Sequence, residues 1–220
     1  SHLHSSITPL SRYDQIDRTT TIYLIDKPGA AQSVIRAGHT SVPRNHEDYY
    51  TLQILNFIFG GQFSARLNQN LRQDKGYSYG FNSSITWHEE RSMIVAGGSV
   101  QTEVTKESVI EVLNEFNDIS RSRPVTTQEI VSSQEGLLKG YASGFERPGQ
   151  ILGKLIQLVT NDMPDDYFQT LPDRFGEVTL QDVHDAGVLR ITPGEIVVLV
   201  VGDRNNIEQG LRELDLPVVI

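Results

Sequence analysis

Apolar residues along the chain recur with two different periods, and each period predicts a different kind of element. Apolar positions three and four residues apart indicate amphipathic helices, most clearly over residues 46–59, 105–119 and 127–145. Runs of alternating or β-branched apolar residues indicate strands. The expected strands are residues 19–27, 31–37, 77–88, 92–101, 196–201 and 218–220. Further helices are expected over residues 63–74, 150–160, 163–175, 180–189 and 206–213.

Residues typical of turns and helix caps indicate where several of these elements begin and end. Pro28-Gly29 separates the first two strands, which predicts a tight turn and a β-hairpin. Thr126 and Glu129 form the sequence of a capping box at the start of a long helix. Residues 196–201 are an unbroken apolar run, typical of a central strand that is buried on both faces. Gly97-Gly98 lies inside a strand and indicates close backbone packing rather than an oxyanion loop.

The order of the elements predicts the fold class. Strand pairs alternate with groups of helices, which favours an α+β fold with a mainly antiparallel sheet covered by helices on one face. Residues 1–18 are polar and show no periodicity, so they are interpreted as a lead-in segment. We find no Pro-, Gly- or Ser-rich linker after them, and residues 19–220 are therefore expected to form a single domain.

Composition and charge exclude several classes of partner. The net charge is -9 and the pI about 5.1, and no cluster of Lys and Arg is present, which argues against nucleic acid. No apolar run approaches the ~18 residues of a membrane span, so none is expected. The absence of cysteine excludes disulfides and thiolate chemistry, and it suits either the cytoplasm or a bacterial periplasm.

The histidines do not form a recognisable metal site. A helical zinc motif needs two histidines four residues apart, so that both rings project from one face. The histidines are His2, His4, His39, His46, His88 and His184, and none has a partner at that spacing. We therefore expect no metal or other cofactor to be bound by this chain.

The densest group of special residues runs from Gly60 to Gly80 and includes Arg72 and Tyr79. Arg72 falls in the last turn of an expected helix, where a cation stabilises the terminal carbonyl groups. Tyr79 falls on the apolar side of the following strand, where core packing with its hydroxyl at the rim is the simplest interpretation. Alternatively, the helix end and the strand start bring the two together as hydrogen-bond donors to an extended peptide.

A longer motif within this stretch carries a family resemblance. The pattern Gly60-Gly61-x-Phe63-Ser64-x-Arg66-Leu67, followed by Leu71-Arg72 and Gly76-Tyr77-Ser78-Tyr79, resembles the second-half domain of pitrilysin/insulinase-type zinc metallopeptidases, which include mitochondrial processing peptidase. The resemblance covers most of the chain, with the other elements in family order. It implies that residues 19–220 are the C-terminal, inactive domain and that Arg72 and Tyr79 bind the substrate backbone.

The resemblance also implies a division of labour. In this family one half carries His-x-x-Glu-His and the zinc ion, and the second half closes over the substrate. The partner of this chain is then a zinc-bearing half domain, in cis or in trans, and the ligand is an extended peptide. The chain is expected to be inactive alone and to clamp substrate during peptide-bond hydrolysis. A second functional hypothesis is a structural or assembly domain of the same fold. A third is a free-standing enzyme that uses carboxylates for catalysis.

Overall fold

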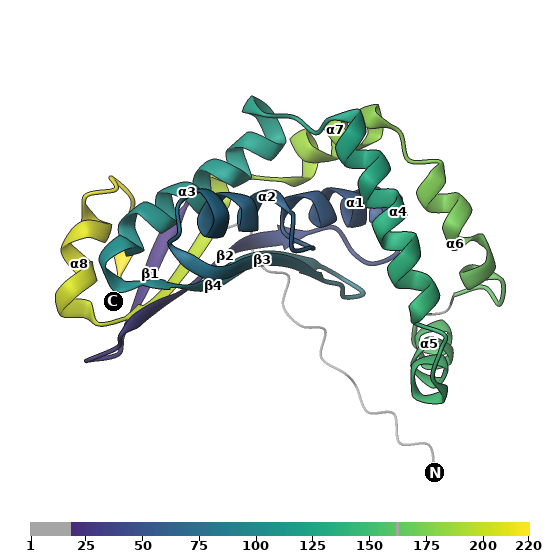
Figure 1. Ribbon diagram of the computed structural model, residues 1–220, viewed down its shortest axis with the longest axis horizontal. Helices are drawn as coiled ribbons and strands as arrows, with labels where there is room; N and C mark the ends of the chain where they lie inside the picture. Colours follow the sequence, from purple (N-terminus) through teal and green to yellow (C-terminus); the bar gives the residue numbers. More distant parts are fainter. Residues whose placement is uncertain (1–18, 162) are drawn as a thin grey trace, which may run out of the picture.

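The computed structural model describes residues 19–161 and 163–220, which form a six-stranded sheet with helices on one face (Figure 1). The strands are β1 (Thr21–Asp26), β2 (Gln32–Ser41), β3 (Ser78–Thr86), β4 (Ser92–Gln101), β5 (Val197–Gly202) and β6 (Val218–Val219). The predicted α+β class is confirmed. The lead-in segment expected over residues 1–18 lies outside the described residues.

The helices follow the predicted order. The α-helices are α1 (Tyr49–Phe59), α2 (Arg66–Asn68), α3 (Thr105–Asn117), α4 (Thr127–Ser143), α5 (Pro148–Thr160), α6 (Tyr167–Gly176), α7 (Leu180–Arg190) and α8 (Arg204–Arg212). Four short segments join them: η1 (Gln69–Asp74) and η3 (Asp118–Ser122) are π-helical, and η2 (Thr102–Val104) and η4 (Pro193–Glu195) are 3₁₀-helical. The capping box predicted at α4 is present, with the hydroxyl of Thr126 accepting from the backbone N–H of Glu129.

The strand order is β3-β4-β2-β5-β1-β6, and it corrects the predicted first hairpin. Strands β1 and β2 are not paired with each other, because β5 lies between them, parallel to β1 and antiparallel to β2. The turn at Pro28-Gly29 does form, and Gly29 takes the positive φ of 72° that favours glycine. Strand β5, which lies nearly 170 residues further along the chain, is inserted between β1 and β2. The residues of the turn cannot predict this pairing.

One face of the sheet is covered and the other is open. The covered face packs against α1 and α3, where Leu52, Phe59 and Phe116 are almost fully buried. No described helix covers the opposite face (Figure 1). There Tyr23, Ile25 and Val197 are 42%, 51% and 48% exposed. The predicted burial of β5 on both faces is therefore wrong: β5 is central in the sheet, but only Val198 and Val200 point into the core.

Candidate substrate-binding site

The stretch from Gly60 to Gly80 forms a loop, a short helical segment and the first residues of an edge strand. The helix expected over residues 63–74 begins only at Arg66, and from Gln69 it widens into the π-helix η1. Gly76 has a φ of 67° and reverses the chain into β3, as expected for a glycine after a helix end. Single π-helical turns occur frequently at functional sites, and Arg72 lies within this one.

Three faces of this helical segment have three different environments. Leu67 and Leu71 are fully buried and point into the core. Arg66 and Asn70 contact α3 and the start of α4. Asn68 and Arg72, also four residues apart, line a cavity beside β3. The helical spacing of residues 66 to 72 thus places three pairs of side chains on three faces: one in the core, one against α3 and α4, and one at the cavity.

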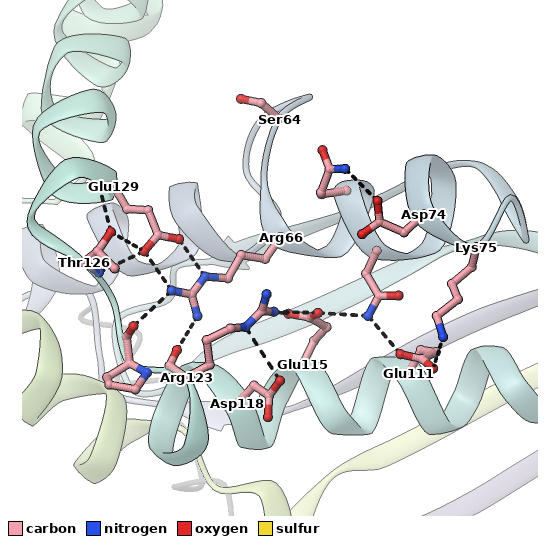
Figure 2. A pocket seen from close by; sticks show the side chains of 13 residues that line it. Ser64, Arg66, Asp74, Lys75, Glu111, Glu115, Asp118, Arg123, Thr126 and Glu129 are labelled. Carbon is pink, nitrogen blue, oxygen red and sulfur yellow. Dashed lines mark hydrogen bonds and ion pairs between the residues drawn. The ribbon is translucent and has the colours of Figure 1, made fainter.

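Arg66 forms the main anchor (Figure 2). Its side chain is 8% exposed, and its Nε and Nη2 donate to the two carboxylate oxygens of Glu129 at 2.7 and 2.8 Å. The guanidinium also donates to the backbone carbonyls of Arg123 and Pro124. Partial burial raises the pKa of Glu129, but hydrogen bonds from Arg66 and Thr126 outweigh burial and lower this pKa from 4.5 to about 2. The helical segment is therefore tied to the turn before α4 and to the first turn of α4.

A second set of polar contacts extends this anchor along α3 (Figure 2). Glu115 is buried and accepts hydrogen bonds from Asn70 at 2.9 Å and from Arg123 at 2.6 and 2.8 Å. Asn70 also donates to Glu111, which forms an ion pair with Lys75 at 3.1 Å. Contacts at residues 66, 70 and 75 hold the whole length of the segment, so the side chains on its cavity face project from a rigid support.

The start of β3 contains a β-bulge that reorients Tyr79. Ser78 pairs with Val100 and Phe81 with Gly98, so three steps along β3 match two steps along β4. As a result Ser78 and Phe81 both point inward, whereas Tyr79 is 87% exposed. The strand alternation had placed Tyr79 on the apolar face, and the interpretation as a core residue is wrong. The extra residue of the bulge points the phenol into the cavity instead.

Arg72 and Tyr79 line the same cavity, which has a volume of about 470 Å³. The guanidinium of Arg72 lies 4.3 Å from the ring centroid of Phe63, a cation–π contact that holds it at the cavity wall. Within residues 19–161 and 163–220, neither the guanidinium of Arg72 nor the hydroxyl of Tyr79 has a hydrogen-bond or ion-pair partner. Arg72 does lie in the last turn of η1, so the helix-end interpretation stays compatible with its position.

The back of the cavity is closed by backbone contacts to the edge of β3. The side-chain carbonyl of Asn68 accepts from the N–H of Phe81 at 3.1 Å, and the carbonyl of Gly60 accepts from the N–H of Ser83 at 2.9 Å. A Cβ at Gly60 would lie 2.5 Å from that same nitrogen, so only glycine permits this approach. These contacts cover part of an edge strand and fix the loop that carries Phe63.

Sequence reasoning identified Arg72 and Tyr79 but missed the roles of Phe63, Asn68 and Arg66. The spacing of Asn68 and Arg72 by four residues was the available signal that both share one helix face. An aromatic residue at position 63 has no helical register to place it, because it precedes the first helical turn. The partners of Arg66 are Arg123, Pro124 and Glu129, which lie 57 to 63 residues further along the chain, so no local pattern predicts them.

Potential metal ligands are scattered over the described residues. Within the part of the chain that the structure describes, no three His, Asp or Glu side chains gather to hold an ion. His39 and His184, for example, each bond to a backbone carbonyl. None of the helices in the described ranges has both the length and the apolarity that a membrane span requires.

Comparisons with known proteins agree on one family. The sequence pattern described as Peptidase M16 inactive domain matches residues 5–137, more than half of the chain. An uncharacterized zinc protease of Rickettsia felis is 27% identical over 179 residues, which are 72% of this chain and 42% of the relative. An uncharacterized zinc protease of Bacillus subtilis is 29% identical over 113 residues, 51% of this chain and 27% of the relative.

The fold agrees with the same family. The crystal structure of a peptidase M16 inactive domain from Pseudomonas fluorescens superposes with a TM-score of 0.76 at 22% identity, over 84% of this chain and 44% of that one. The present chain thus spans less than half the length of these relatives.

Proposed function

Because this chain belongs to the Peptidase M16 family as its inactive domain, we propose that it is the substrate-clamping half of a zinc metalloendopeptidase. The observation that carries the proposal is the pair of unpaired donors, Arg72 and Tyr79, that line one cavity beside an edge strand. A guanidinium has five N–H donors and a phenol has one, and the backbone carbonyls of an extended peptide are matching acceptors.

The support of the cavity favours a binding role over a purely packing one. The helical segment that carries Arg72 is fixed by the contacts of Arg66, Asn70 and Lys75, and the Gly60 loop is fixed to β3. Rigid placement of donors lowers the entropy lost when a ligand binds. A tyrosine that only filled space would lie in the core, whereas Tyr79 is 87% exposed.

The hydrolytic chemistry is proposed to come from a partner half. The described residues do not fit a zinc ion, so the zinc and the general base are assigned to a His-x-x-Glu-His half domain, on the same chain or another. In that complex Arg72 and Tyr79 orient the peptide, and the Tyr79 hydroxyl donates to the oxygen that becomes negatively charged during attack. Alone, residues 19–220 are expected to bind peptide without cleaving it.

The test is to combine this chain with a His-x-x-Glu-His half and zinc and to follow cleavage of an extended peptide. Loss of one positioned donor to a developing oxyanion costs about 10²–10³-fold in rate, so Tyr79→Phe and Arg72→Ala are expected to slow cleavage by at least about 10-fold. Arg121→Ala removes an exposed arginine that does not line the cavity and serves as the control. Unchanged cleavage by both cavity variants contradicts the clamp and favours the structural alternative.

A further inference from the structure

The open face of the sheet carries a single charge among the described strands. The residues that point outward from β1, β5 and β2 include Tyr23, Ile25, Val34 and Val197, all apolar and at least 36% exposed. Arg36, in the middle of β2, is also exposed on this face. Asp26 is the other Asp, Glu, Lys or Arg residue of the described strands. It shares the side of β1 that carries the core residues Ile22 and Leu24, and its carboxylate accepts from the backbone N–H of Arg204 in α8.

The side chain of Arg36 lies flat across the sheet rather than extending into solvent. Arg36 is paired in register with Gly97 of β4. A Cβ at Gly97 would lie 2.6 Å from Cδ of Arg36 and closer still to its Nη1. The guanidinium therefore occupies the space above Gly97 that any larger residue would fill. A Cβ at Gly97 would also lie 2.7 Å from the backbone carbonyl oxygen of Ile35, which cannot move aside as a side chain can.

The charge of Arg36 points toward the candidate site. Gly97 pairs in turn with Asn82 of β3, and Asn82 lines the cavity together with Arg72 and Tyr79. Neighbouring strands lie about 4.8 Å apart, so the guanidinium over Gly97 is about one strand spacing from the Asn82 backbone. Arg36, Gly97 and Asn82 therefore lie in one row across β2, β4 and β3, and Asn82 borders the cavity.

The guanidinium of Arg36 has no hydrogen-bond or ion-pair partner in residues 19–161 and 163–220. A planar guanidinium is the side chain best suited to bidentate recognition of a carboxylate. The exposed side chains of β1 and β5 on this face carry no carboxylate that would compete for Arg36. Among the described strands, Arg36 is therefore the one cationic donor that an anion meets on the open face.

The geometry points to Arg36 as a binding site for a carboxylate of the substrate peptide, beyond the residues held at Arg72 and Tyr79. This inference rests on the proposed clamping function and adds a substrate class, peptides with an acidic group. Tyr79 and Asn82 are three residues apart on β3, and an extended peptide advances about 3.3 Å per residue. The preferred carboxylate therefore belongs about three to four positions from the residue at the clamp, as an Asp or Glu side chain or as the C-terminal carboxylate.

A peptide-binding scan of the full 220-residue chain tests this inference without the partner half. Fluorescein-labelled, C-terminally amidated peptides carry one Glu at successive positions of an otherwise neutral sequence, and the matched peptides carry Gln. A second set places a free C-terminus at each position, which separates the two sources of the carboxylate. Fluorescence anisotropy at low salt is expected to show about three- to five-fold tighter binding of Glu than Gln at one position only.

Three substitutions at one site sharpen the readout. Arg36→Gln is expected to abolish the preference for Glu without weakening the binding of the Gln peptides. Arg36→Lys is expected to retain part of the preference, because Lys keeps the positive charge but cannot donate two parallel hydrogen bonds to a carboxylate. Arg36→Glu is expected to reverse the charge preference, so that a peptide with Lys at that position binds more tightly than the Glu peptide. Arg121→Gln removes an equal charge outside the sheet and is expected to leave the preference intact. Unchanged melting temperatures confirm that the variants are folded.

The outcomes separate this inference from the function on which it rests. Binding that depends on Arg72 but shows no Glu preference, or a preference that survives Arg36→Gln, overturns the role of Arg36 and leaves the clamp standing. A Glu preference that depends on Arg36 but not on Arg72 or Tyr79 supports the carboxylate site and contradicts the clamp. No binding by any peptide overturns both.

Discussion

Two arginines six residues apart on one short helical segment have opposite environments. Arg66 is 8% exposed, and four of the five N–H donors of its guanidinium bind one carboxylate and two backbone carbonyls. Arg72 borders a cavity, touches the ring of Phe63 and has no acceptor within the described residues. The same side chain thus supports the fold at one position and leaves its donors available at the other. An arginine with four of its five donors bound within the fold supports structure, and one held in place with unused donors is the candidate for binding.

The largest expected effect comes from removing the buried arginine, Arg66. Arg66→Ala leaves Glu129 with hydrogen bonds from Thr126 alone and removes the donor of two backbone carbonyls, and loss of one partner of a buried ion pair costs about 3–5 kcal/mol. Because Glu129 is 30% exposed, we expect a loss of about 2–4 kcal/mol in the free energy of unfolding, measured by urea denaturation. A variant as stable as the parent chain contradicts the anchoring role.

The next effect concerns the loop that closes the cavity. Gly60→Ala places a methyl group 2.5 Å from the backbone nitrogen of Ser83, and overpacking of this kind costs about 1–3 kcal/mol. Gly80→Ala is the matched control, because the nearest atom to its Cβ is the side-chain oxygen of Asn68 at 3.9 Å. Thermal unfolding followed by circular dichroism is expected to show a lower Tm for Gly60→Ala than for Gly80→Ala. Equal values contradict the close approach of the loop to β3.

The pH dependence of the anchor is expected to be smaller. The pKa of Glu129 is lowered to about 2 in the folded chain from 4.5, so its stabilising contribution is complete above pH 4.5 and is lost as the pH falls through 2. Allowing for its exposure, we expect Glu129→Gln to cost about 1–2 kcal/mol at pH 7. The difference from the parent chain is expected to shrink between pH 4.5 and 2, in urea titrations at several pH values. A constant difference across this range contradicts the assignment.

The smallest effect on stability is expected at the cavity residues themselves. Arg72→Ala and Tyr79→Phe remove groups that have no hydrogen-bond partner in the described chain, so we expect the free energy of unfolding to change by less than about 0.5 kcal/mol. Chemical denaturation checks this value, in parallel with the cleavage assay. Large destabilisation by either variant shows that these side chains support the fold, and the contrast with Arg66 is lost.

Local patterns predicted most elements but not how distant ones meet. The capping box at Thr126 and Glu129, the glycine reversal at Gly76 and the α+β class follow from neighbouring residues and are confirmed. The hairpin expected at Pro28-Gly29 failed because β5, far along the chain, pairs with both β1 and β2. A turn signal specifies that the chain reverses, whereas strand pairing depends on which apolar surfaces bury together.

The candidate site shows the same limit at the scale of single side chains. Arg72 and Tyr79 could be selected from the motif, but their meeting in one cavity depends on the π-helical turn and on the β-bulge. Strict alternation along β3 would have turned Tyr79 into the core. The substrate-binding role of both residues stays a prediction.

The sequence by itself determined the α+β class, the positions of most helices and strands and the membership of the Peptidase M16 family, because periodicity, caps and motif residues act over a few neighbouring positions. Only the tertiary structure decided that Arg66 hydrogen-bonds within the fold and that the guanidinium of Arg72 has no acceptor among the described residues. That distinction depends on partners such as Glu129, some 60 residues away, which come within reach only when the core of α1, α3 and the sheet is buried.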